Sequence, residues 1–188
     1  MRALRQSGLV LALLGLLFAA ACGSSSTSSS TSSTAAATAS TADLNGLLIE
    51  ASDLGLTGFT RGPVQPAAPG LPGVAATYAS ADNSKNIQIQ LVRLPDAPTA
   101  KQTYDQAVQG VKSALPAATV RDFPAGDAAT RFDLAQNANV NGQTTSTIVV
   151  LVGRYVAVLV FASPPTDPVP DDILNAVVQK QVAKLKAA

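Results

Sequence analysis

Side chains able to carry out chemistry are few in this chain of 188 residues, which has one cysteine, Cys22, and no histidine. Without histidine, a Ser-His-Asp triad, a Cys-His pair and every imidazole metal site are excluded. Carboxylates remain at Asp122, Asp127 and Asp133, but nothing in their spacing pairs them, and aspartates beside strands are usually solvated turn residues. We therefore expect a protein that is not an enzyme and that holds no cofactor or metal.

Cys22 follows directly on the features of an export signal. Two arginines precede an uncharged apolar run over residues 9–20, and three alanines stand immediately before the cysteine. A positive region, an apolar region and a small-residue cleavage site in this order are typical of a secretory signal peptide. The apolar run is shorter than the roughly 20 residues that span a bilayer. We therefore predict that residues 1–21 are a signal peptide.

The sequence Ala19-Ala20-Ala21-Cys22-Gly23 resembles the lipobox of bacterial lipoproteins, with Ala19 where that family prefers Leu. The resemblance implies that the thiol receives a diacylglycerol and that a dedicated peptidase cuts before Cys22. Lipidation also accounts for a single cysteine in an exported chain, which can form no internal disulfide. A buried free thiol is the alternative, but nothing around Cys22 could form a core. We expect attachment to the cell membrane, on its extracytoplasmic face, through lipid at Cys22.

Two regions follow the cysteine. Residues 23–42 contain only Gly, Ser, Thr and Ala, a composition typical of linkers, so residues 22–42 are predicted to be the lipidated cysteine and a disordered tether. An O-glycosylated stalk is the alternative. Residues 43–188 have the length of one ordinary domain and are predicted to form a single globular unit.

The charge of the chain argues against nucleic acid as a partner. The formal net charge of +1 becomes −1 once the two arginines of the signal peptide are subtracted. The remaining basic residues are scattered until the last turn of the chain. A basic face of the kind that contacts phosphates is therefore not expected.

The domain is predicted to begin with a pair of strands. Residues 74–79 and 86–94 have strand character on either side of a turn at residues 82–85. In the second strand Ile and Leu alternate with Gln88 and Gln90. We expect these two glutamines to face water.

A helix and two short strands are expected next. Thr99 and Gln102 form a capping-box signature, and apolar residues then recur at helical spacing until Pro116. Shorter strands are predicted over residues 119–123 and 128–135.

The most apolar part of the domain is predicted to be a long hairpin. Its arms, residues 144–152 and 155–162, are joined by Gly153-Arg154, where a leading glycine suits a type II′ turn. Both arms are apolar at nearly every position, so both faces should be covered, and Val150 and Val158 should be dry. The sequence therefore predicts three layers.

The last element is predicted to be an amphipathic helix over residues 171–186, beginning after Pro170 with two aspartates and ending with lysines. It could lie on a membrane, but the central strands need a cover, so core packing is favoured. The fold class is therefore α+β, with an antiparallel sheet of about six strands covered by two main helices.

This order of elements, behind a lipobox and a Ser/Thr-rich tether, resembles the Mog1/PsbP-like lipoproteins of actinobacterial envelopes. The segment Leu47-Leu48-Ile49-Glu50-Ala51-Ser52-Asp53-Leu54 is similar to the apolar opening, ending in Asp-Leu, of many such domains. The resemblance implies a three-layer Mog1/PsbP-like arrangement, a location in the envelope and a binding role.

Two loops are candidates for contact with a partner. Prolines at every third position suit polyproline II, either as a ligand for an aromatic groove or as a stiff connector. Alternating asparagines suit a turn, with a polar or calcium site as the alternative. The residues concerned are Pro63, Pro66, Pro69 and Pro72 in the first loop, and Asn137, Asn139 and Asn141 in the second.

The function expected from the sequence is that of a non-catalytic binding module for an envelope protein, a glycan or a small apolar molecule. A structural or sensory accessory subunit of a membrane complex is the alternative. We expect a packed core rather than a lipid-filled cavity, with recognition by loops over residues 136–142 and 63–73.

Overall fold

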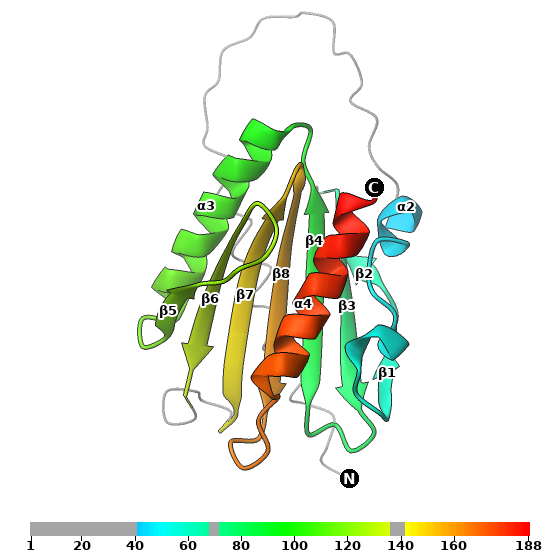
Figure 1. Cartoon of the computed structure of the whole chain (residues 1–188), viewed down its shortest axis with the longest axis vertical. Coiled ribbons are helices and arrows are strands. Elements are labelled where there is room, and N and C mark those ends of the chain that lie inside the picture. The colour runs from blue at the N-terminus through cyan, green and yellow to red at the C-terminus, as the bar shows by residue number, and fades with distance from the viewer. Residues whose placement is uncertain (1–40, 68–71, 136–141) are drawn as a thin grey trace, which may run out of the picture.

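The computed structural model of this protein describes residues 41–67, 72–135 and 142–188. The predicted signal peptide, Cys22 and residues 23–40 of the tether lie outside these ranges, as do Pro69 and the three asparagines. The described residues form an α+β fold, in which helices flank one antiparallel sheet (Figure 1). No helix within them is both long and apolar enough to cross a membrane.

The described part of the chain contains eight strands and four helical segments. The strands are β1 (Phe59–Arg61), β2 (Gln65–Pro66), β3 (Gly73–Ser80), β4 (Asn86–Arg93), β5 (Thr119–Asp122), β6 (Ala128–Leu134), β7 (Thr144–Val152) and β8 (Tyr155–Ser163). The helices are α2 (Thr41–Asn45), the 3-10 helix η2 (Ala51–Leu54), α3 (Ala97–Ala114) and α4 (Asp171–Lys186). The sheet order is β1-β3-β4-β8-β7-β6-β5, and β2 pairs with β3.

The sheet is larger than the sequence predicts. All six expected strands are present, but β1 and β2 add two short ones that pair with β3. With three and two residues, these strands are too short to show an alternating pattern. Pro66, expected in a loop, lies in β2, where a residue without an N–H is tolerated because the strand is at an edge.

Helices cover both faces of the sheet, and the central hairpin contributes to two separate cores. Val158 packs with α3 in one core, whereas Val150 packs with α4 in the other. Each valine is 1% exposed, as expected. The turn between the strands is Gly153-Arg154, and the φ of Gly153 is 55°, which agrees with the expected type II′ turn. Apolar residues of α4 are buried in its core, so this helix packs on the sheet.

Helix α3 begins earlier than its capping signature predicts. The N-cap is Asp96, whose side chain accepts a hydrogen bond from the Thr99 backbone N–H at 2.7 Å. Thr99 is therefore the third residue of the helix, and the capping box with Gln102 is wrong. Pro98 is tolerated in the first turn because the missing N–H would have no helical partner there.

Gln88 and Gln90 do not face water as predicted; they are 5% and 2% exposed. Strand β4 lies inside the sheet between β3 and β8, so neighbouring strands shield both sides of these side chains. The Gln90 amide donates to the Ala67 carbonyl at 3.1 Å. The alternation of Ile and Leu with glutamine correctly predicts a strand, but the polarity of the glutamines does not indicate that they are exposed.

Helix α4 also holds the segment between α2 and η2. The buried Gln181 side chain accepts from the Ile49 N–H at 3.2 Å and donates to the Leu47 carbonyl at 2.7 Å. Lys184 donates to the Leu48 carbonyl at 2.8 Å. These contacts satisfy backbone groups of a segment that has no strand partner of its own.

Candidate functional site

An open cleft of about 550 Å³ lies at one end of the sheet, where β6, β7 and β8 meet the start of α4. Its floor comes from side chains on the α4 face of the strands, and one wall is the segment that leads from β8 into α4. Polar and apolar groups share the lining, which consists of Thr119, Arg131, Asp133, Leu134, Ala135, Thr144, Thr145, Ser146, Phe161, Ser163, Pro168, Val169, Pro170 and Asp171.

Arg131 is the charged residue of the cleft that is most deeply placed, with a side chain 9% exposed. Its Nε donates to Asp133 Oδ1 at 2.8 Å and its Nη2 to Asp171 Oδ1 at 2.7 Å. Burial by itself would lower the pKa of Arg131, but hydrogen bonds to the two carboxylates raise it above its ordinary value. The guanidinium therefore stays charged and joins β6 to α4.

A second arginine extends this network at the edge of the sheet. Arg121 of β5 stands opposite Arg131 of β6, and its Nη2 lies 2.9 Å from Asp133 Oδ2. The Ser146 hydroxyl donates to the other oxygen of Asp133 at 2.6 Å. Asp133 therefore separates two like charges that the register places side by side. The group has no net charge, because it consists of two arginines and two aspartates: Arg121, Arg131, Asp133 and Asp171.

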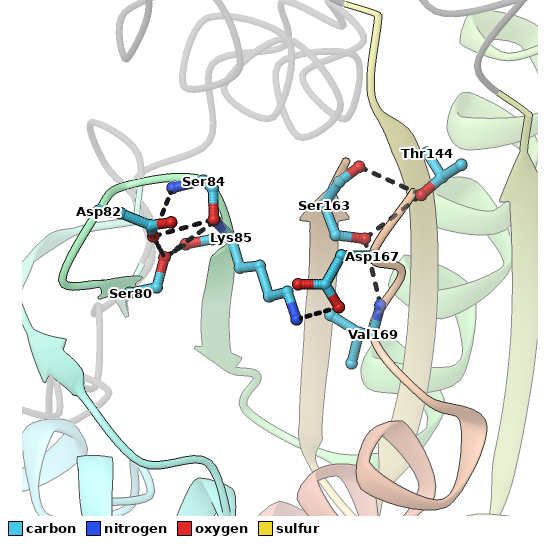
Figure 2. Close-up of polar contacts among 8 residues, drawn as sticks. All are labelled: Ser80, Asp82, Ser84, Lys85, Thr144, Ser163, Asp167 and Val169. Atoms are coloured by element: carbon cyan, nitrogen blue, oxygen red, sulfur yellow. Dashed lines mark hydrogen bonds and ion pairs between the residues drawn. The ribbon is translucent and has the colours of Figure 1, made fainter. Parts of the chain in front are cut away.

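The wall of the cleft is fixed by polar contacts on buried Ser163 (Figure 2). The Val169 backbone N–H donates to Ser163 Oγ at 3.2 Å, and Thr144 Oγ1 donates to the Ser163 carbonyl at 3.2 Å. Lys85, immediately before β4, forms an ion pair with Asp167 at 2.7 Å. The segment from β8 to α4 is thereby attached to β7 and to the turn between β3 and β4.

That turn has its own network, also seen in Figure 2. Asp82 Oδ1 accepts from the Ser80 hydroxyl at 2.6 Å, the Ser84 hydroxyl at 2.9 Å and the Ser84 backbone N–H at 3.1 Å. These hydrogen bonds, led by that from Ser80, lower the pKa of Asp82 to about 2. Asn83 takes a left-handed φ of 57°, as asparagine does more readily than most residues.

The described residues next to the two loops predicted to contact a partner lie at opposite ends of the sheet. Asn137, Asn139 and Asn141 are outside the described residues, but Leu134 and Ala135 before them and Thr144 after them line the cleft. The proline-rich segment lies instead beside the first residues of β3, at the far end.

The prolines of that far segment are at the surface. Pro63 and Pro66 are exposed and Pro72 is half-buried, whereas Pro69 is not among the described residues. None of the three described prolines lines the cleft, so the structure brings the two predicted loops into no common site.

The three aspartates weighed for carboxylate chemistry are also apart. Asp133 lies in the cleft and is paired with arginines, whereas Asp127 accepts from the Gly153 N–H at 2.6 Å near the other end of the sheet. Asp122 is exposed at the end of β5. Within the described ranges, no group of three metal-binding side chains comes together.

Sequence reasoning missed Arg131 and Asp171 as a pair. Arg131 lies in a strand whose apolar residues Ala129, Phe132 and Leu134 are buried, and Asp133 follows two positions later on the same face. The signal available in the sequence for a buried charged pair was a basic and an acidic residue two positions apart in a strand with many apolar residues. Nothing local indicated that Asp171 would complete the contact.

Comparison with known proteins finds one structural likeness worth reporting. No protein-family model matches the chain, and no curated protein matches it. The fold is similar to the crystal structure of the extracellular domain of PknH from Mycobacterium tuberculosis, with a TM-score of 0.59. The match covers 79% of this chain and 97% of that domain, at 11% sequence identity. At this identity the likeness shows a shared fold.

Proposed function

We propose that this protein is a membrane-tethered, non-catalytic binding module of the cell envelope, with lipid on Cys22 and the cleft as its binding surface. The observation that carries the proposal is the cleft itself, which is built on the sheet and includes Ala135 and Thr144 in its lining. Recognition residues concentrate on loops held by such scaffolds. The likeness to an extracellular domain supports a location outside the cytoplasm.

The lining of the cleft, which combines polar and apolar groups, suits a partner that is itself both polar and apolar. Threonine and serine hydroxyls lie in the lining beside Arg131, Asp133 and Asp171. The net charge of these three residues together with Arg121, at the edge of the sheet, is zero. Hydroxyl and carboxylate groups recognise glycans or peptide segments by hydrogen bonds, and Thr119, Thr144 and Ser146 place hydroxyls in this lining. Among the three classes expected from the sequence, an envelope protein or a glycan fits this cleft better than a small apolar molecule.

The position of the cleft suits a module held by its N-terminus. Helix α2, the first described element, lies beside the end of α4, whereas the cleft surrounds the start of α4 (Figure 1). A helix of 16 residues is about 24 Å long at 1.5 Å per residue. A tether that leaves α2 toward the membrane would therefore present the cleft on the opposite side.

A sensory or structural accessory subunit is the second candidate. It is favoured by the likeness to a domain that is itself the extracellular part of a larger protein. We also propose that the domain belongs with the Mog1/PsbP-like lipoproteins. The expected order of six strands and two main helices, with one helix on each face of the sheet, supports this assignment.

Photo-crosslinking in intact cells tests the binding surface. A photoreactive amino acid at Thr119, an exposed residue of the cleft, is expected to yield adducts with a specific envelope component. The same group at Gln106, on the exposed side of α3, is the matched control and should yield none of them. Adducts that are identical at both positions, or absent at Thr119, would contradict the proposal.

The lipid anchor has its own test in the full chain. Wild-type protein should partition into detergent and carry an acyl mass on Cys22, because two or more acyl chains hold a protein on a membrane stably. Cys22→Ala should instead leave uncleaved precursor or protein released from the membrane. Intact-mass measurement distinguishes these products, and a wild-type protein without acyl mass would refute the anchor.

A further inference from the structure

Strand β5 forms an open edge of the sheet. It pairs with β6 on one side only, and all four of its residues are exposed (Figure 1). Helix α3 makes its contacts with the sheet mainly at β6, β7 and β8. The opposite edge is protected, because Pro66 in β2 offers no N–H and η2 packs against β1. Strand β5 contains no proline and remains available to another strand.

The register of β5 shows which of its backbone groups point outward. The Phe123 N–H donates to the Ala129 carbonyl at 3.0 Å, so these opposite residues form a hydrogen-bonded pair of the antiparallel ladder. Such pairs recur at every second residue, so the N–H and C=O groups of Val120 and Asp122 point away from β6. The described residues supply no backbone partner for these outward groups. Two donors and two acceptors of the ladder are therefore open at this edge.

The side chains of β5 present an apolar group here. Val120 is 43% exposed and is the large apolar side chain that the described ranges leave most open to solvent. Opposite it in β6 lies Phe132, which is buried in the core beneath α3, so Val120 extends that core to the edge. Unpaired charges commonly protect an edge from other strands. The charge of Arg121 offers little such protection, because it is paired with Asp133 on the other face.

A second copy of β5 fits this edge in one register. In an antiparallel pair about a two-fold axis, an outward residue must lie opposite another outward residue. Pairing Val120 with Asp122 would set Arg121 against its own copy, which is destabilising. Pairing Asp122 with itself would set two carboxylates together and place Pro124, which has no N–H, opposite Val120. Pairing Val120 with Val120 sets Arg121 opposite Thr119 and brings no like charges together.

We propose that two copies of this chain associate through β5, with Val120 opposite Val120 of the second copy, so that the two sheets become one. Each Val120 N–H donates to the carbonyl of the other copy, and the two valine side chains cover each other. The interface is short, but copies held on one membrane by the proposed lipid at Cys22 meet at a raised effective concentration. The two clefts, each lined by its own Thr119, then flank the joined strands on one face.

Disulfide trapping in intact cells tests this register. Opposite residues of a hydrogen-bonded pair have Cα atoms about 5.5 Å apart, which suits a disulfide. The full chain carrying Val120→Cys is therefore expected to give a disulfide-linked dimer on a non-reducing gel after mild oxidation. Asp122→Cys, on the same strand and face, is the matched control and should give none, because its two copies lie about 14 Å apart along the strand. Wild-type protein controls for Cys22.

Charge placed at Thr119 provides a second measurement in the same assay. Thr119→Arg, added to Val120→Cys, would face Arg121 of the second copy and should lower the yield of dimer severalfold. Thr119→Glu in the same background would face the same arginine and should keep or raise the yield. Both positions are exposed, so the variants should accumulate in cells to the level of wild type.

Three results would overturn the proposal. The first is that Val120→Cys, present at the wild-type level, gives no dimer, or is linked to a different protein instead. The second is that Val120→Cys and Asp122→Cys give equal yields, which would indicate random collision. The third is that Thr119→Arg and Thr119→Glu change the yield equally, because the register places Arg121 opposite this position.

Discussion

Arg131 Nη2 lies 2.7 Å from Asp171 Oδ1, and this contact joins the sheet to the first turn of α4 across forty positions of sequence. Its two members differ in environment, because the Arg131 side chain is 9% exposed and the Asp171 side chain 66%. Buried Arg131 depends on exposed Asp171 for part of the hydrogen bonding that compensates its loss of solvation. The cleft is therefore shaped by a pair whose two halves should respond differently to mutation.

Replacement of Arg131 by Met should lower the free energy of unfolding by about 1–3 kcal/mol, because Asp133 loses a partner and polar contacts with α4 disappear. Asp171→Asn is the comparison. Since Asp171 is mostly exposed and Arg131 keeps Asp133, it should cost less than about 1 kcal/mol. Urea denaturation measures both. Equal losses in the two variants would show that the buried arginine contributes no more to stability than the exposed aspartate.

A charge in the centre of the sheet should prevent folding. Val158 lies in β8, the central strand, beneath α3, and an unpaired buried aspartate costs several kcal/mol, comparable with the stability of a whole domain. Val158→Asp should therefore give no cooperative melt by circular dichroism. Val120→Asp is the matched control, because Val120 is exposed in edge strand β5 and should tolerate the change. A Val158→Asp variant that melts like wild type would disprove the architecture.

The turn at Asp82 should weaken in acid. The pKa of this carboxyl is lowered in the folded protein to about 2 from an ordinary value of 3.8. A lowered folded-state pKa means that the stabilisation is complete above about pH 4 and is lost as pH falls toward 2. Titration followed by NMR should show the Asp82 carboxyl and the Ser84 amide changing together near pH 2. A midpoint near 4 would mean that the hydrogen bonds do not form.

Gln181 should be worth more than its neighbours on α4. Gln181→Leu removes both hydrogen bonds to the 47–49 backbone and leaves buried groups unpaired, so it should lower the free energy of unfolding by about 1–3 kcal/mol. Gln179→Leu is the control, since its amide contacts the Pro124 carbonyl at the surface and should cost less than about 1 kcal/mol. Chemical denaturation measures both variants. Equal effects would argue against a special role for Gln181.

Residues with a clear local pattern could be predicted from sequence. The hairpin of β7 and β8 combines two apolar runs with Gly153 at a two-residue turn, and each property independently favours the same structure. Strand β1, with three residues, has no such pattern and depends on pairing with β3. The exposure of Gln88 was mispredicted for a related reason. Alternation shows which residues share a face, but not whether another part of the protein covers it.

The cleft is less predictable because its parts come from distant segments. The expectation that residues 136–142 bind a partner stays a prediction, although Ala135 and Thr144, on either side of that segment, line the cleft. The pair of Arg131 and Asp171 depends on where α4 begins over the sheet, which local propensity does not determine. The prolines and the asparagines were both predicted to contact a partner. The described residues beside them lie at different ends of the sheet, and this separation depends on the tertiary fold.

Helix α4 is hydrogen-bonded to the segment before β1 through Lys180, Gln181 and Lys184. These bonds have a mechanical consequence. Lys180 donates to the Asp53 carbonyl at 2.6 Å, which extends the contacts made at Leu47, Leu48 and Ile49. A force applied at Thr41 would load α2, which contacts β3, together with these bonds to α4. They lie within about one turn of α4, so they would share the load rather than break one at a time. Traction through the N-terminus would thus be borne by β3 and the last helix together, at the end of α4 away from the cleft.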